Sequence, residues 1–353
     1  MIILGAGASR ADGAPLQKEL FPSYFSEYRA RPVETGLAER LSHFFDTFFG
    51  RADDVYPTFE EALGVLDLAL LRGESFRGLP NTSTKPQIQQ TRDDLTLLMA
   101  RVIDWRLEER NRYHRALVSR LDREGRLRRT CFISLNYDIL IDNALIEIYP
   151  RHDIDYGVDF TNFHVARRRA PRTEVTPGGV DQPWRPPRRT KAVSLLKLHG
   201  SLNWLYCPAC VQLSLTPKVK GALVDKPEPC RTCSTDMVPI VIPPTFFKVM
   251  SNFYLQQVWH AAEEVLANAK RLYFCGYSFP DADMHVKYLL KRAEVNRSDS
   301  RFEIFVANEC VDKRQEERNA EERRFRRYFC DGARVHYKKV SFETFATTGY
   351  VGE

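Results

Sequence analysis

Hydrophobic residues follow two different patterns along the chain. Apolar residues that recur every three or four positions are typical of amphipathic helices, whereas short continuous apolar runs are typical of buried strands. The two patterns alternate over residues 240–340, which predicts an α/β fold with a mostly parallel sheet and helices on both faces. Strands are expected there at Ile240–Ile242, Arg271–Cys275, Phe302–Ala307 and Arg334–Lys338, and helices at Tyr254–Asn268, Asp283–Val295 and Asp312–Tyr328.

The region before residue 125 has a helical pattern that follows a single short strand. Ile2–Leu4 runs into the glycine turn Gly5–Ser9, and between there and about residue 125 the sequence contains no convincing strand. We therefore expect a helical module inserted into the α/β domain. Its helices are expected at Leu37–Phe49, Phe59–Leu71 and Leu95–Leu121, with a loop at Gly73–Thr91. A further helix is expected before the module, at Leu16–Tyr28.

The middle of the chain combines strands with irregular segments. We expect strands at Arg129–Leu135 and Val193–Leu198, a helix at Asp138–Ile148, and an irregular excursion at Tyr149–Lys191. The expected organisation is an α/β domain from residues 1–30, 126–202 and 238–353, an inserted helical module from residues 31–125, and a small cysteine-containing module from residues 203–237.

Four of the eight cysteines form two CxxC pairs, Cys207–Cys210 and Cys230–Cys233. Each pair forms a small knuckle, and four thiolates close a tetrahedral zinc site with no open position, which is typical of a structural ion. A redox pair or four unrelated buried cysteines are the alternatives. The spacing favours a zinc-binding module at residues 203–237, with Zn²⁺ as a structural cofactor.

Charge and hydropathy exclude some classes of protein. No run approaches the roughly 20 apolar residues of a membrane span, and Met1–Gly5 is too short for the core of a signal peptide, so we expect a cytoplasmic protein. Because a strand is expected directly after Met1, either that strand is short or the native chain begins upstream. The net charge of +6 is concentrated in residues 167–191 and 314–327. Aromatic residues do not alternate regularly with these charges, so a solvated loop and an exposed helix are favoured over a nucleic-acid groove.

Polar or glycine-rich segments follow the expected strands, where ligands bind in open α/β sheets. At Gly5–Ser9, small residues let the backbone approach a pyrophosphate, and backbone N–H groups attract its charge, although a tight structural turn has the same pattern. Asn136 offers a donor and an acceptor, and His199 can accept a proton near neutral pH. Taken alone, each of these two residues is more typical of a helix cap or a buried structural side chain.

The order of these features resembles the sirtuin family over nearly the whole chain. Gly5–Ser9 (GAGAS) resembles the phosphate-binding loop, Leu135–Asp138 (LNYD) resembles the QNID motif, and Leu198–Ser201 (LHGS) resembles the motif of the catalytic histidine. The paired cysteines follow this histidine, as they do in the family. Gly276–Ser278 resembles the glycine–serine turn that contacts NAD, and Asn308 resembles the asparagine on the adenosine side.

The resemblance implies a Rossmann-type fold that binds NAD⁺ as a substrate. Asn136 and His199 would be catalytic: Asn136 would orient the ribose and a water, and His199 would act as the general base. Asp138 would organise the nicotinamide pocket. The implied cofactor-binding residues are Gly5, Ala6, Gly7, Ser9, Asp12, Asp138, Gly276, Ser278 and Asn308, and the implied zinc ligands are Cys207, Cys210, Cys230 and Cys233.

Two segments depart from the sirtuin pattern. Arg10–Leu16 stands where the family has GIPDFR. Gly13 and Pro15 are similar to that motif, but the phenylalanine and the arginine that end the motif have no counterpart. Ile242–Phe247 stands where the family has a strand that clamps the acyl-lysine peptide, and Pro243 and Pro244 cannot donate the backbone hydrogen bonds of such a strand. With the large helical module, these departures resemble the divergent sirtuin-like domains of bacterial anti-phage defence proteins.

That resemblance implies an NAD⁺ hydrolase that cleaves the nicotinamide–ribose bond, releases nicotinamide and ADP-ribose, and depletes NAD⁺ in the cell. Two enzymes that cleave the same bond, a protein deacylase and an ADP-ribosyltransferase, stay open, as does a non-catalytic scaffold that senses NAD⁺ or ADP-ribose. Related defence domains assemble into oligomers and associate with a second protein, such as a HerA-type ATPase, which the resemblance permits here.

Overall fold

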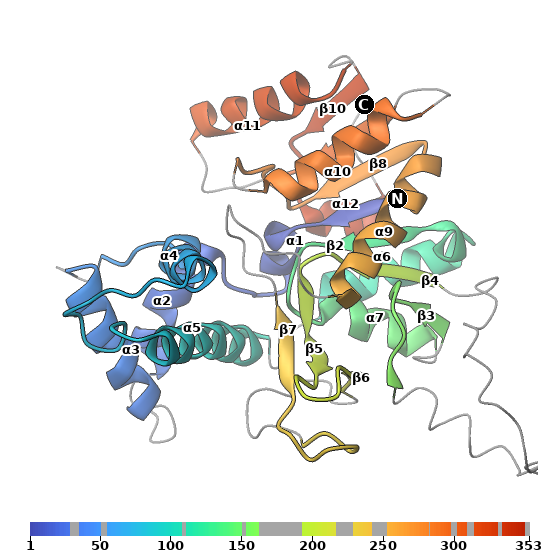
Figure 1. Ribbon diagram of the computed structural model, residues 1–353. Helices are drawn as coiled ribbons and strands as arrows, with labels where there is room; N and C mark the ends of the chain where they lie inside the picture. Colours follow the sequence, from blue (N-terminus) through green and yellow to red (C-terminus); the bar gives the residue numbers. More distant parts are fainter. Residues whose placement is uncertain are drawn as a thin grey trace, which may run out of the picture.

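The computed structural model describes residues 1–28, 35–50, 55–107, 111–149, 153–161, 193–216, 229–241, 253–281, 283–297, 302–308, 314–330 and 334–349. Figure 1 shows an α/β part, in which a sheet is flanked by helices, and a block of helices beside it. A smaller sheet, formed by β5, β6 and β7, lies next to the helical block.

The larger sheet has seven strands in the order β10-β9-β8-β1-β2-β4-β3. Every neighbouring pair within it is parallel, which confirms the predicted α/β class. The first strand lies in the middle, with later strands added on both sides, so the strand order reverses at β1. The strands are β1 (Ile2–Leu4), β2 (Cys131–Ser134), β3 (Ile154–Asp155), β4 (Val193–Lys197), β8 (Arg271–Cys275), β9 (Glu303–Ala307) and β10 (Val335–Lys338).

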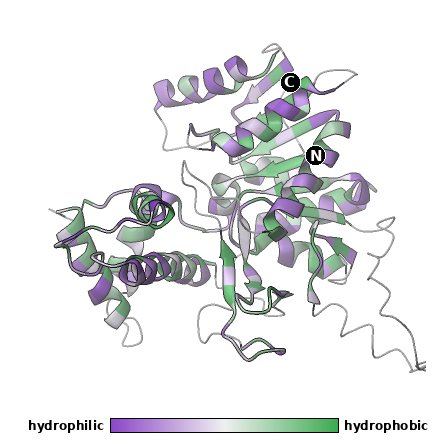
Figure 2. Cartoon of the chain, in the orientation of Figure 1, coloured by the Kyte–Doolittle hydropathy of each residue, from purple (hydrophilic) through white to green (hydrophobic). Residues whose placement is uncertain are grey.

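Helices cover both faces of this sheet. One face carries α9 (Phe253–Asn268) and α10 (Met284–Val295), which pack against each other, and the other carries α6 (Arg112–Arg123), α7 (Leu140–Ile148) and α12 (Phe342–Thr348). Figure 2 shows hydrophobic residues concentrated in the central strands, whereas α11 (Gln315–Tyr328), which packs on β10, is mostly hydrophilic. A single large hydrophobic cluster therefore joins the strands to the inner sides of the helices.

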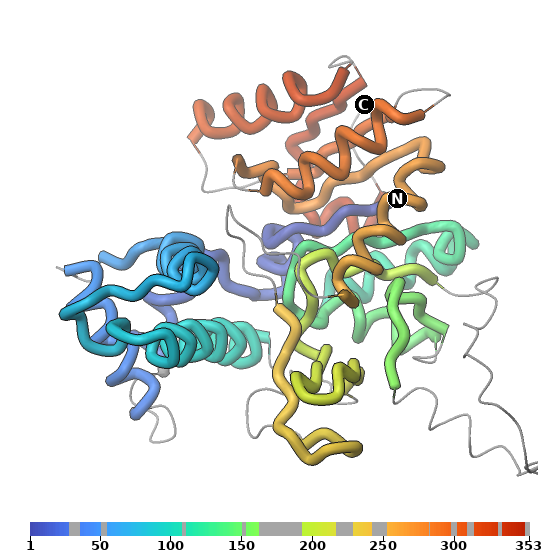
Figure 3. The backbone as a smooth tube through the Cα atoms, in the orientation of Figure 1, coloured from blue at the N-terminus to red at the C-terminus, as the bar shows by residue number. Residues whose placement is uncertain are grey.

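The helical block has its own hydrophobic cluster, built largely from phenylalanine and leucine side chains. Figure 3 shows that the chain leaves the α/β part after its first strand, forms this block and then returns. Its helices have strong end signals: Thr58 and Thr84 form capping boxes, and Gly73 ends a helix in the left-handed conformation. The elements of the block are the 3-10 helix Gln17–Glu19, α2 (Leu20–Ser23), the π-helix Tyr24–Tyr28, α3 (Thr35–Phe48), α4 (Phe59–Arg72) and α5 (Lys85–Arg106). The short helix α1 (Ala6–Ala11) precedes them and packs in the α/β part, where Ala8 belongs to the large hydrophobic cluster.

Two predictions in this region were wrong. The segment Gly73–Thr91 is not a loop throughout, because α5 begins at Lys85, and the expected helix Leu95–Leu121 is divided between α5 and α6. The first turns of α5 are mostly polar on the sequence, so their apolar spacing is weak, yet Ile88 is fully buried. The capping box at Thr84 was the signal that sequence reasoning missed.

The smaller sheet is antiparallel, in the order β6-β5-β7. It consists of β5 (Gly200–Tyr206), β6 (Leu213–Leu215) and β7 (Val238–Val241), of which the sequence analysis anticipated only β7. Gly200 has a φ of 80° and its Cα lies so close to Ile240 that a Cβ would be 2.1 Å from the Ile240 oxygen. This glycine therefore lets the chain turn from β4 directly into β5, which a pattern of hydrophobicity alone does not reveal.

The hydrophobic clusters differ from the expected boundary between the helical module and the α/β domain. Leu117, Val118 and Leu121 of α6 belong to the large cluster, although the sequence analysis placed them in the helical module. We therefore propose that the helical module ends before α6. Among the described residues, no helix is long and apolar enough to cross a membrane.

Candidate functional site

The expected site residues follow the carboxyl ends of strands in the larger sheet. Gly5 follows β1, Asn136 follows β2, His199 follows β4, Gly276 follows β8 and Asn308 follows β9. Parallel strands end at the same edge of a sheet, and a cavity of about 660 Å³ lies there. Among the described residues that line it are Gly5, Ala6, Gly7, Ser9, Asn136, Asp138, His199, Gly276, Ser278 and Asn308.

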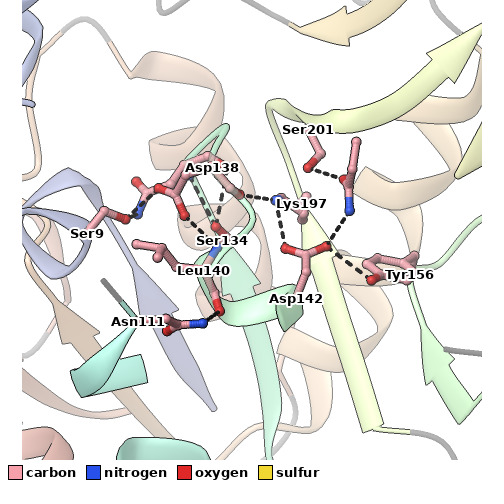
Figure 4. Close-up of polar contacts among 11 residues, drawn as sticks. Ser9, Asn111, Ser134, Asp138, Leu140, Asp142, Tyr156, Lys197 and Ser201 are labelled. Atoms are coloured by element: carbon pink, nitrogen blue, oxygen red, sulfur yellow. Dashed lines mark hydrogen bonds and ion pairs between the residues drawn. The ribbon is translucent and has the colours of Figure 1, made fainter. Parts of the chain in front are cut away.

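A chain of hydrogen bonds joins the first two motifs. Asn136 Nδ2 donates to Ser9 Oγ at 2.7 Å and to Gly5 O at 2.9 Å. Ser9 Oγ in turn donates to Asp138 Oδ2 at 2.6 Å, a contact drawn in Figure 4. Because the donor hydrogens of Asn136 are used within the protein, its Oδ1, an acceptor, is the atom suited to orient a hydroxyl or a water.

His199 is held in one orientation. Its Nδ1 lies 3.0 Å from Leu135 O, and the side chain is buried. A carbonyl oxygen can only accept, so Nδ1 carries the hydrogen, and the lone pair of the neutral ring is on Nε2. A histidine in this tautomer can act as a base through Nε2.

Tyr137 forms the aromatic wall beside His199. The two ring centroids are 6.2 Å apart, and Tyr137 lines the cavity. Burial raises the pKa of Tyr137, and the negative charges of Asp283 and Glu60 raise it further. The phenol therefore stays protonated at neutral pH and can act as a donor but not as a base.

The glycines of the GAGAS turn pack closely against the turn after β8. Gly7 N–H donates to Gly276 O at 2.8 Å and Ala8 N–H donates to Gly5 O at 2.9 Å, so these amides bind the protein itself. A Cβ on Gly276 would lie 2.0 Å from Ala8 N, and a Cβ on Gly5 would lie 2.6 Å from Gly276 O. The glycines thus let the two turns after β1 and β8 touch each other.

Asn308 organises the turn after β8. Its Oδ1 accepts from Tyr277 N–H at 3.1 Å, and its Nδ2 donates to Tyr277 O at 2.6 Å and to Glu321 Oε1 at 2.5 Å. The backbone oxygen of Ser278 accepts from Arg324 at 3.0 Å. Most of the polar capacity of Asn308 is therefore used to hold this turn at the cavity.

The structure does not support a ligand contact by Asp12. Asp12 is not among the described residues that line the cavity. Its carboxylate accepts from Arg112 N–H at 2.7 Å, Tyr113 N–H at 2.9 Å and His114 N–H at 3.1 Å, and it lies 2.6 Å from His114 Nδ1. Asp12 therefore caps the N-terminus of α6, because the first amides of a helix have no partner within it.

The pKa of Asp12 reflects this environment. Burial by itself raises it, but the hydrogen bond and the charge of His114, with the amides of α6, lower it below the usual value. Asp12 and His114 are both almost fully buried. The carboxylate is consequently ionised and fixed, in a structural role.

The four paired cysteines converge as predicted. Their Sγ atoms all lie within 4.8 Å of one another, and Cys210 Sγ is 3.2–3.4 Å from the other three. A tetrahedral site with Zn–S bonds of about 2.3 Å places its sulfurs about 3.8 Å apart, so this set fits Zn²⁺.

A family profile described as SIR2-like domain matches residues 130–328, which is more than half of the chain. The protein belongs to the SIR2-like family. The match covers β2, β4, β8 and β9, the LNYD and LHGS motifs, the cysteines and Asn308. No match was found among curated proteins.

Solved Sir2 structures are similar at low identity. A Sir2 homologue in complex with NAD is 15% identical, with a TM-score of 0.42 over 93% of this chain and 88% of that chain. A Sir2 homologue variant in complex with 2′-O-acetyl ADP-ribose is 15% identical, with a TM-score of 0.44 over 98% of this chain and 88% of that chain. The family assignment does not depend on these structures.

The SIR2-like site also contains residues that the sequence analysis missed. Thr58, Phe59 and Glu60 at the start of α4, with Met99 and Ile103 of α5, line the cavity, so the helical block forms one of its walls. No local signal could have shown this, because these residues are brought to the site only by the packing of the block on the sheet.

Two predictions concern residues that lie outside the described part of the SIR2-like chain. These are the proline pair Pro243–Pro244, which we expect to interrupt peptide binding, and the basic stretch at residues 167–191. The described part of the second charged stretch forms α11, an exposed helix with the pair Arg326–Glu322, as the sequence predicted.

Proposed function

We propose that this SIR2-like protein binds NAD⁺ in the cavity and hydrolyses its nicotinamide–ribose bond. The observation that carries the proposal is that residues from all five strand-end motifs line one cavity of about 660 Å³, in which Asn136 and His199 occur together. This volume is within the usual range for a pocket that encloses a small molecule. Membership of the SIR2-like family supports NAD⁺ as the ligand.

The chain supplies a base and an orienting acceptor. When NAD⁺ is bound, its nicotinamide is the leaving group and positive charge develops on the ribose, as in other glycosidic cleavages. His199 Nε2 accepts a proton from the attacking water or from a ribose hydroxyl. Asn136 Oδ1 orients the ribose and the water, and Asp138 places a negative charge on the wall of the cavity where nicotinamide is proposed to lie.

Other residues contact the rest of the ligand in this proposal. Gly5, Ala6, Gly7 and Ser9 face the pyrophosphate, and the turn that contains Gly276 and Ser278, with Asn308, faces the adenosine side. Cys207, Cys210, Cys230 and Cys233 would hold zinc in the small module and touch no substrate. Water as the acceptor is supported by the two departures from the sirtuin sequence pattern, at Arg10–Leu16 and at Pro243–Pro244, because a proline pair cannot donate the backbone hydrogen bonds that hold a peptide substrate.

The test is incubation of the purified protein with NAD⁺ alone. We expect nicotinamide and ADP-ribose to accumulate at equal rates, measured by chromatography. His199→Ala should lower kcat by about 10²- to 10⁴-fold, the usual range for loss of general acid–base catalysis. Asn136→Ala, which removes an orienting group, should lower kcat by about 10²-fold.

A parallel reaction with an acetyl-lysine peptide separates the alternatives. Product that forms only with the peptide would indicate a deacylase, and ADP-ribose attached to protein would indicate a transferase. Tight binding of NAD⁺ without turnover would indicate a sensing scaffold. Any of these three results contradicts the hydrolase proposal.

We extend the proposal to a role in anti-phage defence, in which a homo-oligomer of this chain depletes cytoplasmic NAD⁺, with a partner such as a HerA-type ATPase. The resemblance of the sequence to defence domains supports it. The same two variants test it, because protection of cells against phage should be lost in His199→Ala and in Asn136→Ala.

A further inference from the structure

A buried lysine lies beneath the proposed site. Lys197, the last residue of β4, and Asp142, in the first turn of α7, form an ion pair with 3.0 Å between Nζ and Oδ2. The side chains of both residues are 0% exposed. Neither is among the described residues that line the cavity, so this pair does not contact a ligand there. Figure 4 shows the pair between the LNYD segment and β5.

The pair is the centre of a fully buried polar network. Asp142 Oδ1 accepts from Tyr156 Oη at 3.1 Å and from Asn203 Nδ2 at 3.3 Å, and Asn203 Oδ1 accepts from Ser201 Oγ at 2.6 Å. Burying two charges is costly, and replacing such a pair by well-packed hydrophobic residues of similar volume is often neutral for stability or even stabilising. Stability alone is therefore a weak explanation for this pair.

The contacts of Lys197 suggest a different purpose. Its Nζ also donates to the backbone oxygen of Asp138. Two further donors from the same segment hold the same loop: His199 Nδ1 donates to Leu135 O at 3.0 Å, and Leu202 N–H donates to Tyr137 O at 2.9 Å. Residues 197–202 thus hold three backbone oxygens of residues 135–138, and Lys197 provides the only charged donor of the three.

We infer that Lys197, fixed by Asp142, is a positioning residue that sets the loop carrying Asn136 and Asp138 at the correct distance from His199. The inference rests on the proposed function, since it concerns the geometry of that site. Lys197 is two residues from His199 and its Nζ reaches the neighbouring strand end, so one side chain connects the two halves of the site. A displacement of about 1 Å at a catalytic centre can lower the rate about 10²-fold.

The experiment compares Lys197→Met, the double variant Lys197→Met/Asp142→Asn and a matched control, Lys291→Met. Lys291 has the same type of contacts, to the Glu294 carboxylate and the Tyr328 backbone oxygen, and like Lys197 it does not line the cavity. These partners of Lys291 lie outside residues 135–138, and its side chain is 32% exposed. In the double variant no buried charge is left without a partner, and the amide oxygen introduced at position 142 can still accept from Tyr156 and Asn203. We therefore expect a Tm closer to that of the wild type than in the single variant.

Two readouts are taken on each protein. With NAD⁺, both Lys197 variants should lower kcat by about 10- to 100-fold with KM changed less than about threefold, whereas Lys291→Met should not change kcat. Hydrogen–deuterium exchange of the peptide covering residues 135–140 should be faster in both Lys197 variants and unchanged in the control.

These readouts separate the two proposals. A wild-type protein that releases no nicotinamide, combined with faster exchange in the Lys197 variants, overturns the hydrolase function but supports positioning of the loop. Unchanged exchange at residues 135–140 overturns the positioning role whether or not NAD⁺ is cleaved. Recovery of both kcat and exchange in the double variant also overturns it, because the pair would then serve stability alone.

Discussion

Asp12 shows at the scale of a single residue how packing redirects a polar side chain. It follows the GAGAS turn closely on the sequence, which made it an expected ligand contact, yet its carboxylate binds the first amides of α6, about 100 residues further along the chain. Asn308 is a milder case: it lines the cavity, but holds the backbone of Tyr277 with both ends of its amide. At this scale, the hydrogen-bond partners within the protein decide whether a polar side chain can also contact a ligand.

Asp12→Asn should destabilise the protein in a pH-dependent way. The folded-state pKa of Asp12 is lowered, so its stabilisation is fully present above the unfolded pKa of about 3.9 and is lost as pH falls through the folded value. We expect the variant to be less stable by about 1–3 kcal/mol at pH 7, in urea unfolding. Below about pH 4 the difference should narrow.

A suitable control is Asp122→Asn, an exposed carboxylate on the same helix. It should have little effect at either pH. A difference between Asp12→Asn and the wild type that stayed constant from pH 7 to pH 3 would argue against the capping role.

At the scale of elements, the sequence predicted those whose hydrophobic pattern is continuous and missed those that depend on neighbours. The boundaries of β8 at Arg271–Cys275 were predicted correctly, and β4 and α10 were predicted to within a residue. In contrast, β3, β5, β6 and α12 were missed. Two of these are very short strands, and β5 follows β4 after only the two-residue turn Leu198–His199, so the hydrophobic pattern gives little indication that two strands are present.

The cysteine module gives a prediction at this scale. The protein should contain zinc by elemental analysis, and Cys233→Ser should remove it and lower the thermal stability, because β5, β6 and β7 are close to the four thiols and their own hydrophobic cluster is small. Cys330→Ser, which changes an exposed cysteine elsewhere in the described chain, should retain the zinc. Full zinc content in Cys233→Ser would exclude the four-cysteine site.

At the scale of the whole molecule, the site depends on two separate hydrophobic clusters. The strand ends belong to the cluster of the larger sheet, whereas Phe59, Met99 and Ile103 belong to the cluster of the helical block. Leu202 belongs to the helical cluster and Tyr137 packs against it, although both lie in or beside the strand-end motifs. A ligand in the cavity therefore contacts both parts of the protein.

Ligand binding should consequently stabilise both parts together. With His199→Ala, which should not consume the ligand, NAD⁺ at about 100 times its Kd should add about 2.7 kcal/mol to the free energy of unfolding. The helical block and the α/β part should both be protected, as measured by hydrogen–deuterium exchange of peptides from α4, α5 and β2. Protection limited to β2 would mean that the helical wall does not contact the ligand.

The sequence by itself determined the class of fold, the family resemblance, the place of the site at the strand ends and the metal-ligating cysteines. These features follow from the local sequence pattern, because parallel strands of one sheet all end at the same edge and the spacing of paired cysteines can be read directly from the sequence. Only the tertiary structure decided which polar groups face the cavity. The amides of Gly7 and Ala8, the Asp12 carboxylate and Lys197 find partners within the protein, and α4 and α5 supply a wall. Most of these contacts join residues far apart in the chain, and such pairings are set by packing and by the cost of leaving buried polar groups without hydrogen bonds.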